Sequence, residues 1–176
     1  ALSDRHVVFA AAVHVRLRER IFMAHQHDPA AHGIAGTLEV LWAARADIQG
    51  DVVARSGTIS IEAVPVVCSS ACDSLVTDIN VADGVKFDTT GLWVNLKTGG
   101  DRRNLAHLDG GDTFLQSRQG SLRLGEGSLI DASAGGAMME DGSFIGASGG
   151  DVTLATGQLP RANMNDLVLG GSLRSY

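Results

Sequence analysis

The sequence is poor in basic residues and in aromatic residues. Its 176 residues include 14 lysines and arginines against 20 aspartates and glutamates, which gives a net charge of −6. A nucleic-acid-binding domain needs a basic surface to neutralise phosphates, so we expect no nucleic-acid partner. Aromatic residues make up only 5% of the chain. A core must therefore be built from valine, leucine, isoleucine and alanine, whose small side chains suit a narrow interior.

The sequence also lacks a long apolar run. The longest such run is VVFAAAV at residues 7–13, far short of the roughly 20 residues that a membrane-spanning helix needs. We therefore expect no membrane span. This run lacks the basic start and the small-residue cleavage site of a secretory signal. The chain begins at Ala1 without a methionine, as an excised internal piece would, so the missing signal says nothing about export.

Glycine, by contrast, is abundant. The chain has 22 glycines and 3 prolines, which favours many tight turns over long helices because glycine reaches positive φ without a steric penalty. The phrase GSLIDAS at residues 127–133 returns 15 residues later as GSFIGAS at 142–148. We expect a turn followed by a strand in each copy. Ile130 and Ala132 then point one way and Ser128 the other, as do their counterparts in the second copy.

Related phrases occur elsewhere in the chain. Gly36 is followed directly by TLEV, and Gly57, 21 residues after Gly36, is followed directly by TISI; DVTL occupies residues 151–154. In this pattern Ile59 and Ile61 take the places of Val152 and Leu154. Short alternating strands that return every 15 to 30 residues after a turn glycine predict a solenoid whose rungs stack on one another. The Gly-Gly-Asp sequences at 110–112 and 149–151 lack the further glycine and aspartate of a calcium-binding repeat, which indicates turns.

The length suits one domain with a continuous core. Residues 1–35 lack the regular glycine-strand pattern and are expected to form the first rungs or a cap. They fit either one or two strands or, in RLRERIFMAH, a short helix. Regular rungs are predicted for 36–158, interrupted by a polar, glycine-broken loop at 91–112 that projects from the coil. Residues 159–176 form a terminal rung or tail, with one strand at 167–169.

Several of these phrases carry a family resemblance. SLIDASAGG, ASGGDVTLATG, GDVVARSGTISI and above all GLWVN resemble the haemagglutinin-repeat region of filamentous haemagglutinin-type adhesins. These are large exoproteins that Gram-negative bacteria export by two-partner secretion. The resemblance covers most of residues 36–158. The asparagine-rich signatures of the family's amino-terminal secretion domain are absent, so the chain would be an interior section, and no toxin module is visible.

The resemblance implies a right-handed parallel β-helix that forms part of a rod at the cell surface. The chain would then be a structural and adhesive segment, secreted and held on the surface of a Gram-negative bacterium, with no cofactor and no enzymatic activity. Its expected partners are a glycan or protein on a host-cell or bacterial surface and, during export, the outer-membrane two-partner transporter.

The projecting loop is the expected contact site with a partner surface. It holds the densest mixture of acidic, basic and polar side chains in the chain, and a tryptophan such as Trp42 or Trp93 can stack on a sugar ring, although it can equally anchor a core or loop. The residues expected to make contact are Trp93, Asn95, Arg102, Arg103 and His107.

Two other groupings of residues could form sites. His25, His27, Asp28 and His32 resemble a zinc motif of metallo-hydrolases with displaced ligands, and on a solvated turn we expect no metal there. Cys68 and Cys72 are separated by three residues, in the spacing C-x3-C, without a nearby histidine. In an exported protein they would close a small loop as a disulfide; the alternative is two thiols, one of them buried.

Two other classes of function stay open at this point. One is a carbohydrate-active enzyme or receptor-binding spike built on a β-helix and acting on polysaccharide, for which Asp101, Asp109 and Asp112 are the nearest candidate carboxylates. The other is a haem- or metal-capturing exoprotein, for which the only support is the six histidines.

Overall fold

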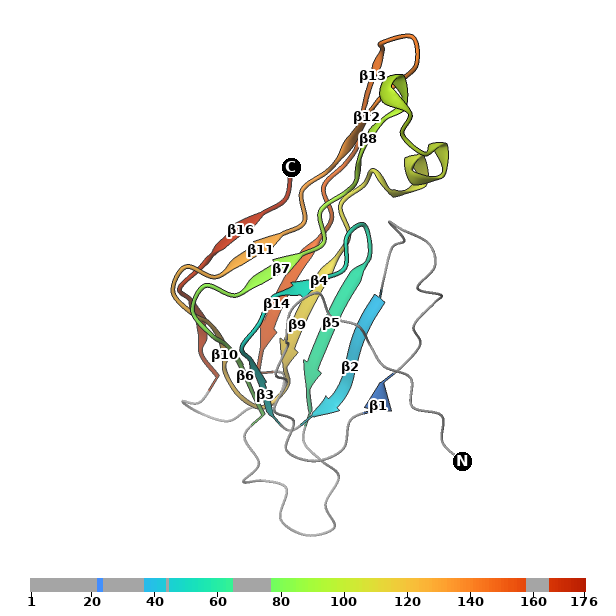
Figure 1. The fold of residues 1–176 in the computed structure, drawn as a ribbon. Helices are drawn as coiled ribbons and strands as arrows, with labels where there is room; N and C mark the ends of the chain where they lie inside the picture. The colour runs from blue at the N-terminus through green and yellow to red at the C-terminus, as the bar shows by residue number, and fades with distance from the viewer. Residues whose placement is uncertain (1–21, 24–36, 44, 65–76, 158–164) are drawn as a thin grey trace, which may run out of the picture.

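The computed structural model describes residues 22–23, 37–43, 45–64, 77–157 and 165–176, and these ranges are mostly β-strand. The helices within them are two short 3-10 segments, η2 (Leu96–Thr98) and η3 (Arg102–His107). The strands form four sheets, and three of these consist mainly or wholly of parallel pairs. The predicted all-β class is therefore confirmed, with parallel sheets (Figure 1).

The largest sheet has five strands. Neighbouring strands in this sheet pair in parallel, except that the first strand runs antiparallel to the second. In order across the sheet, the strands are β1 (Phe22–Met23), β2 (Thr37–Ala43), β5 (Thr58–Ala63), β9 (Thr113–Ser117) and β14 (Val152–Thr156).

Two further sheets have four strands each, and all of their pairs are parallel. One sheet contains β3 (Arg45–Ile48), β6 (Asp78–Val81), β10 (Leu122–Leu124) and β15 (Leu167–Leu169). The other contains β4 (Val52–Val53), β7 (Lys86–Asp88), β11 (Leu129–Asp131) and β16 (Ser172–Arg174).

The chain visits these three sheets repeatedly in the same order. We call each visit a pass: the first is β2-β3-β4, the second β5-β6-β7, the third β9-β10-β11 and the fourth β14-β15-β16. Every strand pairs with its counterpart in the adjacent pass, so backbone hydrogen bonds connect the passes along all three sheets.

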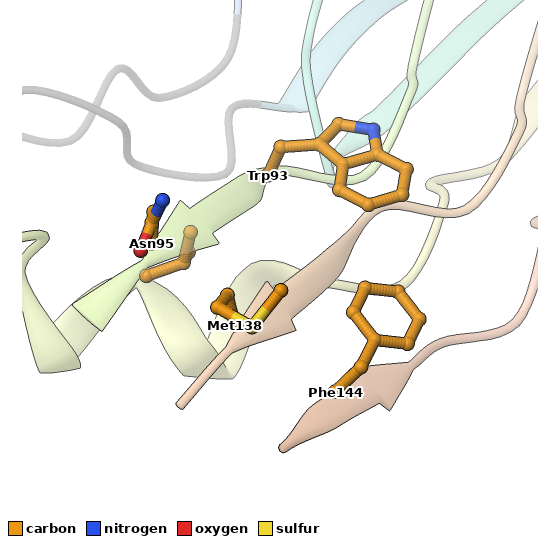
Figure 2. Close-up of a pocket in the computed structure, with 5 residues that line it drawn as sticks. Trp93, Asn95, Met138 and Phe144 are labelled. Carbon is orange, nitrogen blue, oxygen red and sulfur yellow. The ribbon is translucent and has the colours of Figure 1, made fainter. Parts of the chain in front are cut away.

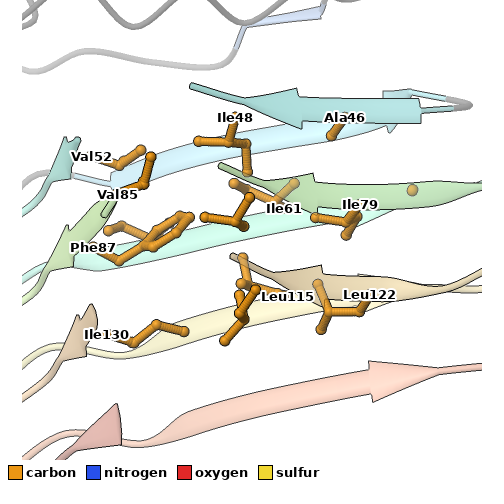
Figure 3. Close-up of a cluster of buried hydrophobic side chains, with 14 of the residues drawn as sticks. Ala46, Ile48, Val52, Ile61, Ile79, Val85, Phe87, Leu115, Leu122 and Ile130 are labelled. Atoms are coloured by element: carbon orange, nitrogen blue, oxygen red, sulfur yellow. The ribbon is translucent and has the colours of Figure 1, made fainter. Parts of the chain in front are cut away.

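Paired positions align apolar residues from pass to pass and so build the core. Val52 pairs with Phe87, and Phe87 with Ile130; the three residues are 2%, 0% and 1% exposed. Other such columns converge on the same interior (Figure 3). Along β5 the inward residues alternate with half-buried ones, because successive side chains of a strand point to opposite faces. Within the described core, Phe87 is the one aromatic side chain.

The correspondence predicted between Ile59, Ile61 and DVTL is confirmed. Ile59 and Val152 both pair with Thr113, and Ile61 and Leu154 both pair with Leu115. Glycine-turn phrases separated in sequence therefore do occupy equivalent places.

The interval between passes is longer than predicted. The second and third passes place Asp83 beside Glu126, 43 positions apart, and the third and fourth place Asp112 beside Asp151, 39 positions apart. The predicted interval of 15 to 30 residues is wrong for these passes, because a complete pass needs three strands and the turns between them.

The two copies of the repeated heptad are not successive rungs. GSLIDAS contains β11, inside the third pass, whereas GSFIGAS contains β13 (Phe144–Gly146), which pairs antiparallel with β12 (Gly136–Met138). The second copy is the return strand of a hairpin. Its Ser143 and Ile145 are both exposed.

The prediction that Ser128 points away from Ile130 is also wrong. Ser128 is 2% exposed, Ile130 is 1% exposed and Ala132 is 0% exposed, so all three lie on the inner side. The physical reason is the two-residue period of a strand, which places alternate residues on one face.

Aspartates at the turns also connect the passes. In each case a carboxylate oxygen accepts a backbone N–H of the following pass, with donor–acceptor distances of 2.7 to 2.9 Å. The acceptor and donor residues are Asp51 and Lys86, Asp78 and Ser121, Asp83 and Glu126, Asp109 and Ser148, and Asp112 and Asp151. These side chains supplement the backbone pairing where the strands end.

Glycines allow the passes to approach closely at one corner. A Cβ on Gly111 would lie 1.8 Å from the carbonyl oxygen of Gly57, and a Cβ on Gly150 would lie 2.2 Å from that of Gly111. Only glycine fits such a stack. The Gly-Gly-Asp sequences, which were predicted to be turns, therefore serve the close packing of the passes.

Candidate functional site

A small sheet projects beyond the three large sheets and forms the candidate site. It consists of β8 (Trp93–Asn95), β12 and β13, with β8 parallel to β12 and β13 antiparallel to it. Figure 1 shows it extending away from the passes together with η2 and η3. The interpretation of residues 91–112 as a loop is thus wrong in part, because this stretch contains a strand and two 3-10 segments.

The two faces of β8 differ in burial. Val94 is 6% exposed and packs with Leu96, Leu108 and Ala137 in a small second core, whereas Trp93 is 72% exposed. This second core fixes the projecting sheet. The alternation of the strand then directs Trp93 and Asn95 to the opposite, open face.

The open face carries an apolar surface, which we call the aromatic face and define by Trp93, Asn95, Met138 and Phe144 (Figure 2). Asn95 pairs with Met138, and Met138 with Phe144, across the three strands. Together with Val94 they line a hollow of about 330 Å³. Phe144 is 57% exposed. Exposed aromatic residues of this kind are enriched at binding surfaces.

Trp93 and Phe144 make a stacked aromatic pair. Their ring centroids are 5.9 Å apart and their planes are inclined by 25°. Gly136 leaves the space for this contact, because a Cβ there would lie 2.7 Å from the Cζ atom of Phe144. The missing side chain of Gly136 lets the phenyl ring lie over β12 toward the indole.

Asn95 connects the aromatic face to η2. Its Oδ1 atom accepts a hydrogen bond of 3.1 Å from the backbone N–H of Lys97 and so caps the 3-10 segment. This bond uses one of the two lone pairs of Oδ1, and the amide nitrogen of Asn95 supplies two N–H donors.

The two predicted arginines lie outside the hollow and have different partners. Arg102 donates a 2.8 Å hydrogen bond to Glu140, in the turn of the β12–β13 hairpin, and so ties η3 to that hairpin. Arg103 pairs with Asp101 at 2.7 Å. Hydrogen bonds from the Arg103 side chain, then from its backbone, hold the pKa of Asp101 below its ordinary value.

His107 takes part through its backbone. Its carbonyl oxygen accepts a 2.7 Å hydrogen bond from the N–H of Leu92, directly before β8. The structure therefore brings Trp93 and Asn95 together on the aromatic face, and places Arg102, Arg103 and His107 in or beside η3.

Met138, Phe144 and Glu140 were missed by the sequence analysis. Phe144 was assigned to a rung because GSFIGAS repeats GSLIDAS, and the pairing of Met138 with Asn95 joins positions far apart in the chain. A signal was present in the second copy, where a phenylalanine replaces the leucine of the first.

The remaining predicted groupings lie outside the described residues. These are His25, His27, Asp28 and His32, and the cysteines Cys68 and Cys72. Among the described residues, no group of three or more histidine, cysteine, aspartate or glutamate side chains is arranged to hold a metal ion.

The carboxylates considered for catalysis are engaged in hydrogen bonds. Asp101 caps η3 by accepting the backbone N–H of Arg103 at 2.9 Å. Asp109 and Asp112 accept backbone N–H groups of the fourth-pass turn at 2.8 and 2.9 Å. Their oxygens hold turns and passes together.

No protein-family model, curated protein or solved structure matches this chain. In the described ranges, no helix has the length and apolar character required to cross a membrane. The class that the structure defines is a strand-rich fold with parallel sheets and a projecting aromatic face.

Proposed function

We propose that the chain is a section of a right-handed parallel β-helix and that it serves as a structural and adhesive segment of a large bacterial surface adhesin of the filamentous haemagglutinin type. In this proposal the adhesin is secreted through a two-partner transporter in the outer membrane. The stacked passes act as a stiff spacer, and the projecting sheet contacts a glycan or protein on a host-cell or bacterial surface.

The sheet topology supports the architectural part of this proposal. Parallel pairing of each strand with its counterpart one pass later, on three sheets at once, is the pattern of a three-sided coil. Parallel strands in one sheet are connected with a right-handed crossover in about 98% of cases, which favours the right-handed form. The aliphatic columns would then lie along the axis of the coil.

The observation that carries the adhesive part is the exposure of the Trp93–Phe144 pair. Two aromatic side chains that are 72% and 57% exposed leave apolar surface in water that a partner could bury. Their position on a sheet that projects from the passes makes them accessible to a large partner such as a cell surface. Trp93 also belongs to the GLWVN phrase on which the resemblance rests.

The test is binding of the purified protein to host cells, bacterial cells and an array of glycans. We expect Trp93→Ala and Phe144→Ala to weaken binding about tenfold or more, as truncation of a central aromatic contact does. Val53→Ala is the matched control, because Val53 is 54% exposed on β4, away from the projecting sheet. Absence of binding by the wild type, or equal binding by Trp93→Ala, would refute the adhesive role.

A screen for glycan depolymerisation separates this proposal from the enzyme alternative. We expect no turnover, and we expect Asp101→Asn and Asp109→Asn to leave binding unchanged. Turnover that either substitution abolishes would replace the adhesin proposal with the enzyme. A neighbouring gene for a two-partner transporter would support the proposed route of export.

A further inference from the structure

Met138 places a thioether in the hollow of the aromatic face. Its side chain lines the hollow together with Trp93 and Phe144, and Figure 2 shows it between Asn95 and Phe144, its pairing partners on the two neighbouring strands. The side chain is partly exposed. Among the residues that line the hollow, Met138 is the one that a mild oxidant converts from apolar to polar.

The pairing of the hairpin holds Met138 close to Phe144. The backbone N–H of Met139 donates a 2.8 Å hydrogen bond to the carbonyl oxygen of Ser143, so the next pair along the hairpin, Met138 and Phe144, is a non-hydrogen-bonded pair. The Cα atoms of such a pair approach to about 4.5 Å, closer than in a hydrogen-bonded pair. A thioether beside an aromatic ring is a favourable contact, and oxidation of the sulfur changes that contact.

Met139 provides an internal comparison. It directly follows β12, is also partly exposed, and packs against the second core, whereas Met138 lines the hollow on the open face. Successive side chains of an extended segment point to opposite sides. Because the two residues carry the same side chain, a difference in their oxidation reports the difference between the two sides of the hairpin.

We propose that Met138 is an oxidative modification site and that its oxidation by a peroxide turns the aromatic face from apolar to hydrated. The sulfur donates an electron pair to one oxygen of hydrogen peroxide. The S–O bond forms as the O–O bond breaks, and the other oxygen leaves as water with both protons, so sulfur is oxidised and peroxide reduced by two electrons. The sulfoxide oxygen is a hydrogen-bond acceptor that is costly to bury unpaired, so water stays in the hollow.

The modification site itself does not depend on the proposed adhesive function, whereas its consequence for adhesion does. A partner that covers the aromatic face must displace the water held by the sulfoxide or leave the sulfoxide oxygen unpaired. We expect complete oxidation of Met138 to weaken binding about tenfold. Methionine sulfoxide reductases, one for each sulfoxide epimer, should restore binding, because they return the side chain to the thioether.

Peptide mass spectrometry after graded treatment with hydrogen peroxide tests the site. We expect the sulfoxide of Met138 to form about threefold faster than that of Met139. The near-ultraviolet circular dichroism of the Trp93–Phe144 pair should change in step with Met138 sulfoxide. Met139→Leu should show the same change as the wild type, and Met138→Leu should show none at the same peroxide concentrations. Far-ultraviolet circular dichroism checks that each variant is folded.

Binding to cells and to glycans is measured before and after oxidation, and each variant is compared with its own untreated sample. The wild type and Met139→Leu should lose about tenfold in affinity, whereas Met138→Leu should keep its untreated value. This comparison does not require that leucine at position 138 bind as well as methionine.

Equal rates of oxidation at Met138 and Met139, or a spectral change that persists in Met138→Leu, would overturn the modification site. Unchanged binding by the oxidised wild type would overturn its consequence for adhesion. An untreated wild type that binds neither cells nor glycans would refute the adhesive function alone, because the oxidation rates and the spectra still decide whether Met138 is the modification site.

Discussion

At the scale of single residues, acidic side chains serve as hydrogen-bond acceptors in turns. Asp131 accepts both the backbone N–H and the hydroxyl of Ser133, at 3.2 and 2.6 Å, and Asp88 does the same with Thr90. Other aspartates accept N–H groups of the following pass. Many of the aspartates thus organise turns. This structural role accounts for these carboxylates without a catalytic function.

Asp112 provides a test of this role. Replacement by alanine removes the acceptor of the Asp151 N–H and should lower the free energy of unfolding by about 1 kcal/mol, the net worth of a typical hydrogen bond. Asp112→Asn keeps the side-chain oxygen and should lose clearly less. Urea denaturation of the two variants measures the difference. Equal losses in both would mean that charge, and not the hydrogen bond, is what matters at this position.

At the scale of strands, the β12–β13 hairpin uses a repeated phrase in a second context. In β11 the phrase lies between parallel neighbours β7 and β16. In β13 nearly the same residues form the edge strand of a three-stranded sheet. Propensity and alternation are similar in both, so the partner strands decide whether the side chains are buried.

Gly136 lets the hairpin form its aromatic face. We expect Gly136→Ala to displace the Phe144 ring from Trp93, because the new Cβ would lie 2.7 Å from Cζ. The phenyl ring can move, and the backbone of Ile145 must give slightly because the new Cβ would also lie 3.0 Å from its carbonyl oxygen. The loss of stability should therefore be about 1 kcal/mol, the scale of one aromatic pair. The near-ultraviolet circular dichroism of the aromatic side chains should decrease.

Gly146→Ala is the matched control for this prediction. Gly146 pairs with Gly136, but a Cβ there would lie 3.8 Å from the Phe144 ring, at ordinary contact distance. Its spectrum should resemble the wild type. In a Phe144→Ala background, Gly136→Ala should have no spectral effect; a change there would show that the ring is not the group displaced.

At the scale of the whole molecule, ion pairs supplement the stacking of passes around a narrow aliphatic core. Asp88, in the second pass, lies 3.6 Å from Arg55 after the first pass and 3.3 Å from Lys86. Burial alone would raise the pKa of Asp88. The hydrogen bonds from Thr90, followed by the charges of Lys86 and Arg55, outweigh burial and hold this pKa below its ordinary value.

This lowered pKa predicts a sensitivity to acid. The contribution of Asp88 to stability is fully present above its unfolded pKa of about 3.9 and is lost as the pH falls through the lower folded value. Asp88→Asn should therefore reduce the free energy of unfolding at pH 7 by about 1 kcal/mol and make its decline below about pH 4 shallower. Chemical denaturation between pH 7 and pH 2 measures both. A decline as steep as in the wild type would assign the acid sensitivity to other carboxylates.

Local patterns in the sequence were sufficient for the strand-rich class and for many strand positions. The alternation in TISI and DVTL identified β5 and β14 and their equivalence, and Leu167–Leu169 forms a strand where one was predicted. These features depend on neighbouring residues, since a strand has a period of two and a turn needs glycine. Trp93 and Asn95 could be predicted as contact residues from local sequence too, because they are an aromatic and a polar residue in a glycine-rich stretch.

The order of the passes and the composition of the aromatic face were decided by tertiary contacts. Nothing near residue 144 indicates that Phe144 will lie against Trp93, because that contact needs β12 between them and a glycine at position 136. In the same way, Leu122 is buried and its column partner Leu167 is exposed, although both are leucines in short apolar strands. Burial depends on whether another strand lies beyond, and that is a property of the assembled sheets.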